Sequence, residues 1–196
     1  MSCRKLKRKH SVHKNRSRRK ISGTNPWKGF VYKQNFLSTN DFKLLQDECS
    51  RFNTSLYKHK EDLQNVLRYN MVINSSLIRE LITKYTQDIR QLTGNPRLYL
   101  ATNFPIEYRK YGKGSFMDTH RDTQIYKIPQ YECLLTISNT TDSVTNFFTR
   151  KTVSIQSTPN SLVILKANGV KHNVDLTTYG HRYFLKFIFT ETDDLL

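Results

Sequence analysis

Two residues of this chain are placed to do chemistry together: His120 and Asp122, in the run SFMDTHRD. We expect this run to be a β-strand, and side chains at positions i and i+2 of a strand point to the same side. The imidazole and the carboxylate can therefore meet one metal ion, while Arg121 points away. About one histidine in twenty has an acid two residues on, so the pair needs support from the rest of the sequence.

A third metal ligand is expected further along the chain. His172, in VKHNV, follows a β-rich stretch and precedes Arg182 by ten residues. His181 is the rival candidate, but it is adjacent to Arg182 and would point to the opposite face of a strand. His120, Asp122 and His172 would form a triad of two histidines and one carboxylate, which is typical of non-haem Fe(II) oxygenases and leaves three coordination positions open. Two of these positions can take a bidentate 2-oxo acid and one can take O2.

Arg182 has the charge that a 2-oxo acid with a second carboxylate requires. It lies in Gly180-His181-Arg182, where we expect the last strand to begin, among apolar residues. A guanidinium presents a planar fork that matches a carboxylate in two parallel hydrogen bonds. We therefore expect Arg182 to bind the distal carboxylate of 2-oxoglutarate. A cupin-like site for a different metal, or a metal hydrolase, has no need of such an anchor.

Two longer runs resemble a known family. The run from Tyr111 to Asp122, YGKGSFMDTHRD, is similar to the Y-x-x-G…H-x-D segment of the prolyl 4-hydroxylase-like 2-oxoglutarate/Fe(II)-dependent oxygenases. The later run PNSLVILKANGVKHNVDLTTYGHRYFLKFIF is similar to the closing segment of that family, in which a strand precedes H-x-V, G-x-R and an apolar last strand. The resemblance covers roughly residues 97–190, and its motifs occur in the family's order.

This resemblance implies a fold, cofactors and further site residues. The fold would be α+β, with a double-stranded β-helix (jelly-roll) core and N-terminal helices packed on one sheet. His120, Asp122 and His172 would hold Fe(II), with 2-oxoglutarate and O2 as cosubstrates and ascorbate as a reductant. Tyr111 would hydrogen-bond to 2-oxoglutarate, unless it is a packed core tyrosine, and Thr136 in YECLLTISN is a weaker candidate for the same pocket. The reaction would be hydroxylation of a C–H bond on a protein side chain such as proline, with release of succinate and CO2.

The chain departs from the family at two places. Many relatives carry a Gly-Gly segment on the strand after YECLLTISN, where this chain has SVTNFF. Collagen-type prolyl hydroxylases use lysine where this chain has Arg182, so the chain looks more like the oxygen-sensing and bacterial branch. Neither departure touches the iron ligands, and both bear on the substrate more than on the reaction.

The first part of the chain has helical patterns. Three segments are candidates: 39–52, which follows a capping box at Ser38 and Asp41; 59–69, which is weaker; and 75–93, whose apolar stripe ends at Gly94-Asn95-Pro96. Before them, GFVYKQNFL (29–37) is β-rich. We place the helical part at about 38–95.

After Pro96 the sequence becomes a series of short β-rich runs separated by turns. Nine runs have this character: RLYLATNF, IEYRKY, SFMDTHRD, YECLLTISN, TNFFTR, TVSIQS, SLVILKA, VKHNV and RYFLKFIFT. Many short strands at close spacing indicate a sandwich or barrel. Helices followed by a β core of about eight strands, at about 96–192, indicate helices packed on one side of a β-sandwich. The sequence therefore predicts one domain over 27–196.

The formal net charge of +16 is concentrated near the N-terminus. Residues 1–40 contain twelve Lys or Arg and no acid. Ordering residues 1–26 would cost entropy that burial could not offset, because the run RKLKRKHSVHKNRSRRK within them has almost no apolar content. We expect a basic disordered tail that binds nucleic acid or carries a nuclear localisation signal. The alternative is a solvated tail that only raises solubility.

Cysteine usage and hydropathy indicate the compartment. Cys3, Cys49 and Cys133 are far apart and odd in number, which argues against a disulfide framework or a zinc knuckle and fits a reducing environment. No run approaches the ~18 apolar residues of a membrane span, and no secretory signal is evident. We expect a cytoplasmic or nuclear protein that is not secreted and has no membrane partner.

Two classes of function remain at this stage. The leading hypothesis is a 2-oxoglutarate-dependent dioxygenase with a protein substrate. The alternative is a nucleic-acid-binding or scaffold protein on a degenerate oxygenase fold, or an oxygenase that acts on nucleic acid. A degenerate site need not preserve all four of His120, Asp122, His172 and Arg182, which favours the enzyme. The sequence does not indicate the position hydroxylated or the oligomeric state.

Overall fold

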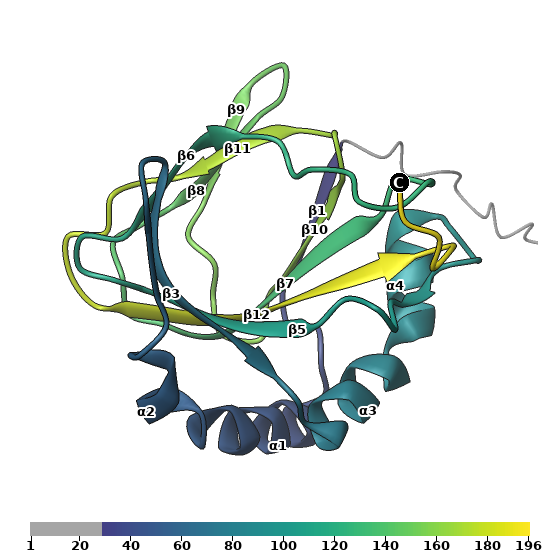
Figure 1. The fold of residues 1–196 in the computed structure, drawn as a ribbon, viewed down its shortest axis with the longest axis horizontal. Coiled ribbons are helices and arrows are strands. Elements are labelled where there is room, and N and C mark those ends of the chain that lie inside the picture. The colour runs from purple at the N-terminus through teal and green to yellow at the C-terminus, as the bar shows by residue number, and fades with distance from the viewer. Residues whose placement is uncertain (1–28) are drawn as a thin grey trace, which may run out of the picture.

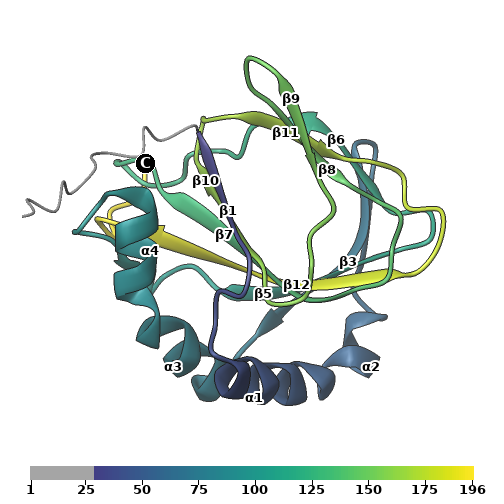
Figure 2. The ribbon, with the colours of Figure 1, turned by 180° about the vertical axis from the view of Figure 1, so that it is seen from behind.

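A computed structural model describes residues 29–196, in which helices lie along one side of a strongly curled antiparallel sheet (Figure 1). The helices are α1 (Thr39–Ser50), α2 (Asn53–Leu56), α3 (Ser76–Lys84) and α4 (Thr86–Thr93). Figure 2 shows from behind that all four gather on the same side of the sheet. Within this part of the chain, no helix is long and apolar enough to cross a membrane. The predicted basic tail, 1–26, lies outside the described residues.

Twelve strands form one continuous sheet in residues 29–196. They are β1 (Phe30–Lys33), β2 (Lys60–Leu63), β3 (Val66–Ile73), β4 (Tyr99–Leu100), β5 (Ile106–Gly112), β6 (Phe116–His120), β7 (Tyr131–Asn139), β8 (Thr145–Phe148), β9 (Thr152–Ile155), β10 (Leu162–Lys166), β11 (Lys171–Val174) and β12 (His181–Thr190). Their order is β1-β10-β7-β12-β5-β3-β6-β11-β8-β9, with β2 beside β3 and β4 beside β12. The sheet curls until β6, β11 and β8 face β5, β12 and β7 (Figure 1). This confirms the predicted double-stranded β-helix core, and each of the nine predicted runs contains a strand.

The helices confirm one sequence prediction and correct another. Helix α1 begins at the predicted capping box, where the Ser38 hydroxyl accepts a hydrogen bond from the Asp41 N–H at 3.2 Å. The helix predicted over 75–93 is instead α3 and α4, which meet at Tyr85. The Tyr85 backbone leaves the helical conformation (φ −96°, ψ 15°), and its hydroxyl donates to the Asp41 carboxylate at 2.6 Å. The helix therefore breaks at Tyr85, where this hydrogen bond to α1 forms. The apolar stripe of the sequence is continuous across 75–93 and does not reveal the break.

The helix predicted over 59–69 is wrong, because this segment forms β2 and the first half of β3. Short apolar runs can fit either a helix or a strand, and here the β2–β3 hairpin and its pairing with β6 decide. Tyr69, Met71 and Ile73 pack into the main hydrophobic core, whereas Arg68 is buried on the opposite face of the strand. Both faces of β3 are therefore used.

Alternation along β5 and β12 gives this part of the sheet two different faces. Tyr108 and Phe187 belong to the main hydrophobic core, which includes side chains from all four helices. Arg109, Arg182 and Lys186 lie on the opposite face, where they line a cavity inside the curled sheet. The helices thus cover the apolar outer face, and the inner face carries polar and charged side chains among apolar ones such as Leu134 and Phe184.

Candidate active site

The three residues predicted to bind a metal lie together. Strands β6 and β11 pair with His120 directly opposite His172, and the centroids of the two imidazole rings are 4.2 Å apart. Asp122 follows β6 by two residues, and its Oδ1 lies 3.7 Å from His120 Nε2 and 3.8 Å from His172 Nε2. One potential ligand atom from each residue lies within 4.8 Å of the other two. A single cation could therefore contact all three side chains.

Hydrogen bonds of the two imidazoles leave the same nitrogen of each ring free for a metal. Nδ1 of His120 lies 2.8 Å from the Asp118 carbonyl oxygen, and Nδ1 of His172 lies 3.2 Å from the Val170 carbonyl oxygen. Because a carbonyl only accepts, each Nδ1 carries the proton and each Nε2 carries the lone pair. His120 Nε2 is buried and has no hydrogen-bond partner among residues 29–196. Two imidazole nitrogens and one carboxylate fit a divalent metal such as Fe(II).

The electrostatics of the cluster favour metal binding at two of the three residues. Burial alone would raise the pKa of Asp122, but His120, His172 and Lys186 together hold it below its ordinary value. Burial lowers the pKa of His172, which keeps its imidazole neutral. Burial also opposes the charged form of His120, but the nearby Asp122 carboxylate and the hydrogen bond to a backbone carbonyl raise its pKa. An ionised carboxylate and neutral imidazoles coordinate metals, so binding would release a proton at His120 if it is charged.

Arg182 lies in the same cavity, near the start of β12. It is 5% exposed, and its guanidinium carbon lies 5.0 Å from the Tyr111 ring centroid and 5.2 Å from the Phe184 ring centroid. One Nη donates to the Thr145 hydroxyl at 3.1 Å, whereas Nε is buried without a partner in the described residues. No acid among residues 29–196 forms an ion pair with it. A buried guanidinium without a counter-ion is costly, so this arrangement fits an anionic ligand.

Tyr111 lies beside Arg182 and also lines the cavity. Its hydroxyl lies 3.5 Å from an Nη of Arg68 and 3.5 Å from the sulfur of Met117. Arg68 is held in turn by Glu61, at 2.8 Å across the β2–β3 hairpin. The contact with Arg68 is long for an N–H···O hydrogen bond and a thioether sulfur is a weak acceptor, so the hydroxyl could turn towards a ligand. The proposed role of Tyr111 in binding 2-oxoglutarate stays a prediction.

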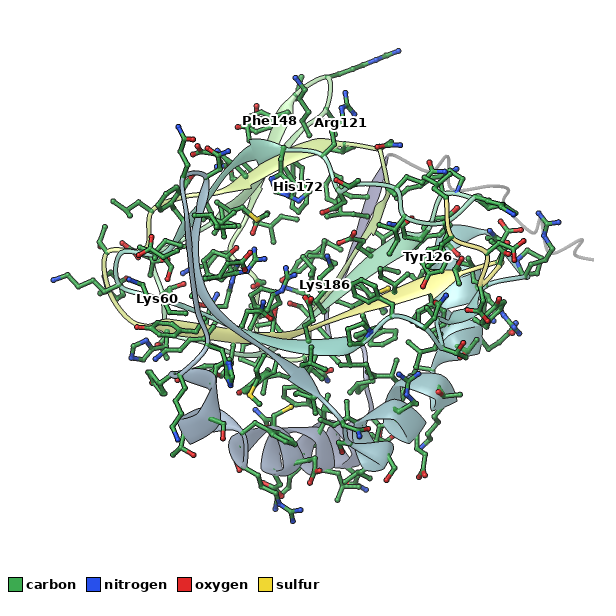
Figure 3. All side chains as sticks on the ribbon, in the orientation of Figure 1. Lys60, Arg121, Tyr126, Phe148, His172 and Lys186 are labelled. Carbon is green, nitrogen blue, oxygen red and sulfur yellow. The ribbon has the colours of Figure 1, made fainter. Side chains whose placement is uncertain are left out.

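A cavity of about 260 Å³ joins these groups. Its lining includes all three residues of the histidine–carboxylate cluster together with Tyr111 and Arg182. Figure 3 shows His172 on one side of the space inside the curled sheet and Lys186 on the other. A dicarboxylate could reach both the cluster and Arg182, because both line one continuous space.

Comparison of the sequence with family models and with curated proteins finds no match. Solved structures do match. A prolyl-4-hydroxylase from Pseudomonas putida superposes with a TM-score of 0.68 at 16% identity, over 84% of this chain and 93% of that chain. The prolyl hydroxylase of Trichoplax adhaerens, in complex with a hypoxia inducible factor oxygen degradation domain peptide fragment, gives 0.66 at 13% identity, over 84% of each chain. The chain has the prolyl 4-hydroxylase fold.

The same fold carries other reactions. The non-heme alpha ketoglutarate dependent epimerase SnoN from nogalamycin biosynthesis gives a TM-score of 0.65 at 12% identity, over 83% of this chain and 78% of that chain. Identities of this size show the fold alone. The prolyl 4-hydroxylase fold therefore confirms the architecture that the sequence motifs implied, and the reaction has to be argued from the residues in the cavity.

Within the prolyl 4-hydroxylase fold, the hydroxyl next to Arg182 comes from a residue that the sequence did not indicate. Thr145, on β8, lines the main cavity and accepts the hydrogen bond from Arg182. Thr136, which the sequence suggested, is buried beside a smaller cavity that Arg182 and Phe184 also line. Its role in binding 2-oxoglutarate stays a prediction. No local signal marks Thr145, because β8 meets β12 only when the sheet closes.

The cavity also has a wall of charged residues, Arg109, Glu132 and Lys186, which we call the charged wall. Lys186 Nζ pairs with the Glu132 carboxylate at 2.6 Å, and Arg109 pairs with Glu107. Sequence reasoning missed all three residues. A signal was present in the sequence. Glu132 is the single charged residue in the run YECLLTISN, and Lys186 is the single charged residue in the run FLKFIF.

Proposed function

We propose that this protein is an Fe(II)- and 2-oxoglutarate-dependent dioxygenase that hydroxylates a C–H bond of its substrate and releases succinate and CO2. One observation carries the proposal: the histidine–carboxylate cluster and a buried guanidinium without a counter-ion line the same cavity. A metal alone would account for the cluster but not for Arg182. A 2-oxo dicarboxylate accounts for both, because its oxo-acid end suits the open positions of such a metal and its far carboxylate suits a guanidinium.

Each residue of the cavity has a defined task in this proposal. His120, Asp122 and His172 would hold the iron, which activates O2 when bound. The two backbone carbonyls that accept from Nδ1 would keep both imidazoles turned towards it. Arg182, held in place by Thr145, would bind the distal carboxylate of 2-oxoglutarate. The surrounding sheet would keep bulk water away from the reacting atoms.

We further propose a protein side chain, such as proline, as the substrate. The Trichoplax structure of the same fold contains a bound peptide fragment, and the Pseudomonas protein is a prolyl-4-hydroxylase. Ascorbate would serve as the reductant that restores Fe(II). The net charge of +16 keeps nucleic acid as the alternative substrate class, and makes it a proposed partner of the basic N-terminal residues.

Spectroscopy of the iron site tests the proposal directly. Anaerobic addition of Fe(II) and 2-oxoglutarate to the full-length chain should give a weak visible charge-transfer band, and admission of air should give succinate. His172→Ala should abolish both, because it removes one of three converging ligands. His181→Ala removes the rival histidine, which is exposed, and is the matched control that should keep both signals.

Two results would contradict the proposal. A band that survives in His172→Ala would remove His172 from the metal site. The absence of both the band and succinate release in the unmodified chain would favour a nucleic-acid-binding or scaffold protein on a degenerate fold.

A further inference from the structure

The charged wall lies away from the proposed 2-oxoglutarate site. Lys186 follows Arg182 by four residues on β12, which is roughly 13 Å along a strand. The charges of Lys186 and Glu132 both act on Asp122, so the wall is close to the proposed metal ligands. Figure 3 shows Lys186 across the interior from His172. A molecule that enters beside the metal without displacing 2-oxoglutarate would meet this wall.

A contribution to folding stability does not explain the presence of the charged wall. Arg109 is 8% exposed and Glu132 is 5% exposed, and the Lys186 side chain is 13% exposed, so all three members of the wall are largely removed from water. Desolvation offsets most of the attraction within a buried ion pair, and apolar residues of similar size are often at least as stable. Leu134 and Phe184 occupy neighbouring inward positions of the same sheet, which shows that this face accepts apolar residues. The charges therefore indicate a ligand that needs them.

Arg109 has a hydrogen-bond donor that the protein does not use. One of its Nη atoms contacts Glu107, but its Nε is buried and has no partner among residues 29–196. A guanidinium carries five N–H donors in a planar fork, so one contact leaves most of its capacity open. Because Arg109 lines the cavity, a ligand there could supply the missing acceptor.

The charges around the cavity sum to an excess of one positive charge when the histidines are neutral. Five cations and two acids line it: Arg68, Arg109, Arg121, Arg182 and Lys186, with Asp122 and Glu132. Glu61 and Glu107 pair with two of these cations and bring the number of acids to four. An Fe(II) ion and a 2-oxoglutarate dianion would cancel each other. The remaining positive charge belongs to Arg121, which is exposed to solvent, so the unused N–H donor of Arg109, and not an excess of charge, is what indicates an anionic acceptor such as a carboxylate.

We propose that the substrate carries a carboxylate beside the carbon that is oxidised, and that Arg109 binds it. The carboxylate belongs to an Asp or Glu next to the hydroxylated residue of a peptide. This inference rests on the proposed function, because the peptide enters between the charged wall and the metal. Lys186 is paired with Glu132 and lies 5.6 Å from the Phe104 ring centroid, so Arg109 is the member of the wall that has a donor left for the substrate.

Two pools of blocked heptapeptides would test the proposal. Both have degenerate sequences, and they differ only at the residues flanking the central position, which are Asp or Glu in one pool and Asn or Gln in the other. Retention of each pool by the full-length chain, loaded with Fe(II) and 2-oxoglutarate, would be measured anaerobically by equilibrium dialysis. Air would then be admitted and products with one added oxygen would be counted by mass spectrometry. We expect the acidic pool to be favoured about tenfold in both measurements, the size of one charge-assisted hydrogen-bonded contact.

Variants separate Arg109 from the general charge of the protein. Arg109→Gln should remove the preference for the acidic pool. Because this change leaves Glu107 unpaired, the double variant Arg109→Gln with Glu107→Gln keeps the position neutral and guards against misfolding. Each variant would be normalised to its own succinate release without peptide. Arg150→Gln removes an exposed arginine outside the cavity and should retain the full preference.

The outcomes distinguish this inference from the proposed function. Equal retention of the two pools by the unmodified chain, or a preference that survives in the double variant, would overturn the carboxylate site. Retention of the acidic pool without any succinate release would instead overturn the proposed function and leave the carboxylate site standing.

Discussion

Arg182 is a buried cation that no acid of the described residues neutralises, so its replacement tests why it is there. Arg182→Met keeps much of the apolar stem and removes the charge and the planar fork. If the guanidinium exists to bind an anion, its burial destabilises the protein when that anion is absent. The variant should therefore be more stable than the unmodified chain, yet unable to respond to 2-oxoglutarate.

The size of the effect follows from the contacts of the guanidinium. Burying an ion costs several kcal/mol even after relaxation, here taken as about 5 kcal/mol. Two ring faces, at 5.0 and 5.2 Å, offset about 1 kcal/mol each. The hydrogen bond to Thr145 offsets about 1 kcal/mol more. The balance of about 2 kcal/mol corresponds to a rise in Tm of about 4–8 °C for a chain of this size.

Calorimetric melting with and without 2-oxoglutarate, in the presence of a divalent metal, is the assay. At a concentration of 100 times Kd, 2-oxoglutarate should stabilise the unmodified chain by about 2.7 kcal/mol and Arg182→Met not at all. Thr145→Val is the matched control, because it removes one hydrogen bond of Arg182 and keeps the charge; it should still respond, at higher ligand concentration. A methionine variant that melts below the unmodified chain, or that 2-oxoglutarate still stabilises, would refute the reasoning.

Two further changes probe the scaffold. Asp41 has a pKa of about 2, below its ordinary value of 3.8, because hydrogen bonds from Lys84 and a tyrosine hydroxyl favour the carboxylate. Its contribution is therefore present above pH 3.8 and lost as the pH falls towards 2. Since the Lys84 side chain is 62% exposed, Asp41→Asn should lower the free energy of unfolding by only about 1 kcal/mol at pH 7. In urea unfolding, the difference between this variant and the unmodified chain should shrink towards pH 2. A difference that does not change with pH would contradict this prediction. Gly180 has φ +73°, and a Cβ there would collide with the Thr140 carbonyl oxygen, so Gly180→Ala should lower the free energy of unfolding by about 2 kcal/mol or more. Gly94 has φ +69° and nothing within 4 Å of a new Cβ, so Gly94→Ala should lower the free energy of unfolding by only about 1 kcal/mol. Equal losses of stability in the two alanine variants would show that the collision at position 180 is relieved at no cost.

The metal-binding candidates were within reach of the sequence, because their arrangement depends on short distances along the chain. His120 and Asp122 are two residues apart, and the order of motifs supplied His172 and Arg182. Their convergence in the structure needs only that β6 and β11 become neighbours. Their assignment as ligands of iron and 2-oxoglutarate stays a prediction until the loaded protein is measured.

The pairing within the charged wall and the contact of Thr145 with Arg182 were out of reach of the sequence, because they depend on register between distant strands. Lys186 on β12 meets Glu132 on β7, and each looks like an isolated charge in its own run. The two misread helices have the same cause. The segment 59–69 is decided by the β2–β3 hairpin and its pairing with the distant strand β6, and the break at Tyr85 accompanies a hydrogen bond to α1.

By itself, the sequence determined which segments alternate as strands, where most turns fall and which side chains can bind a metal, since these depend on residue type and spacing of a few positions. Tertiary structure alone decided which hydroxyl holds Arg182 and which charges share the cavity with the histidines. A curled sheet brings together residues that are far apart in the chain, and the free energy of those contacts exists only after the sheet has closed.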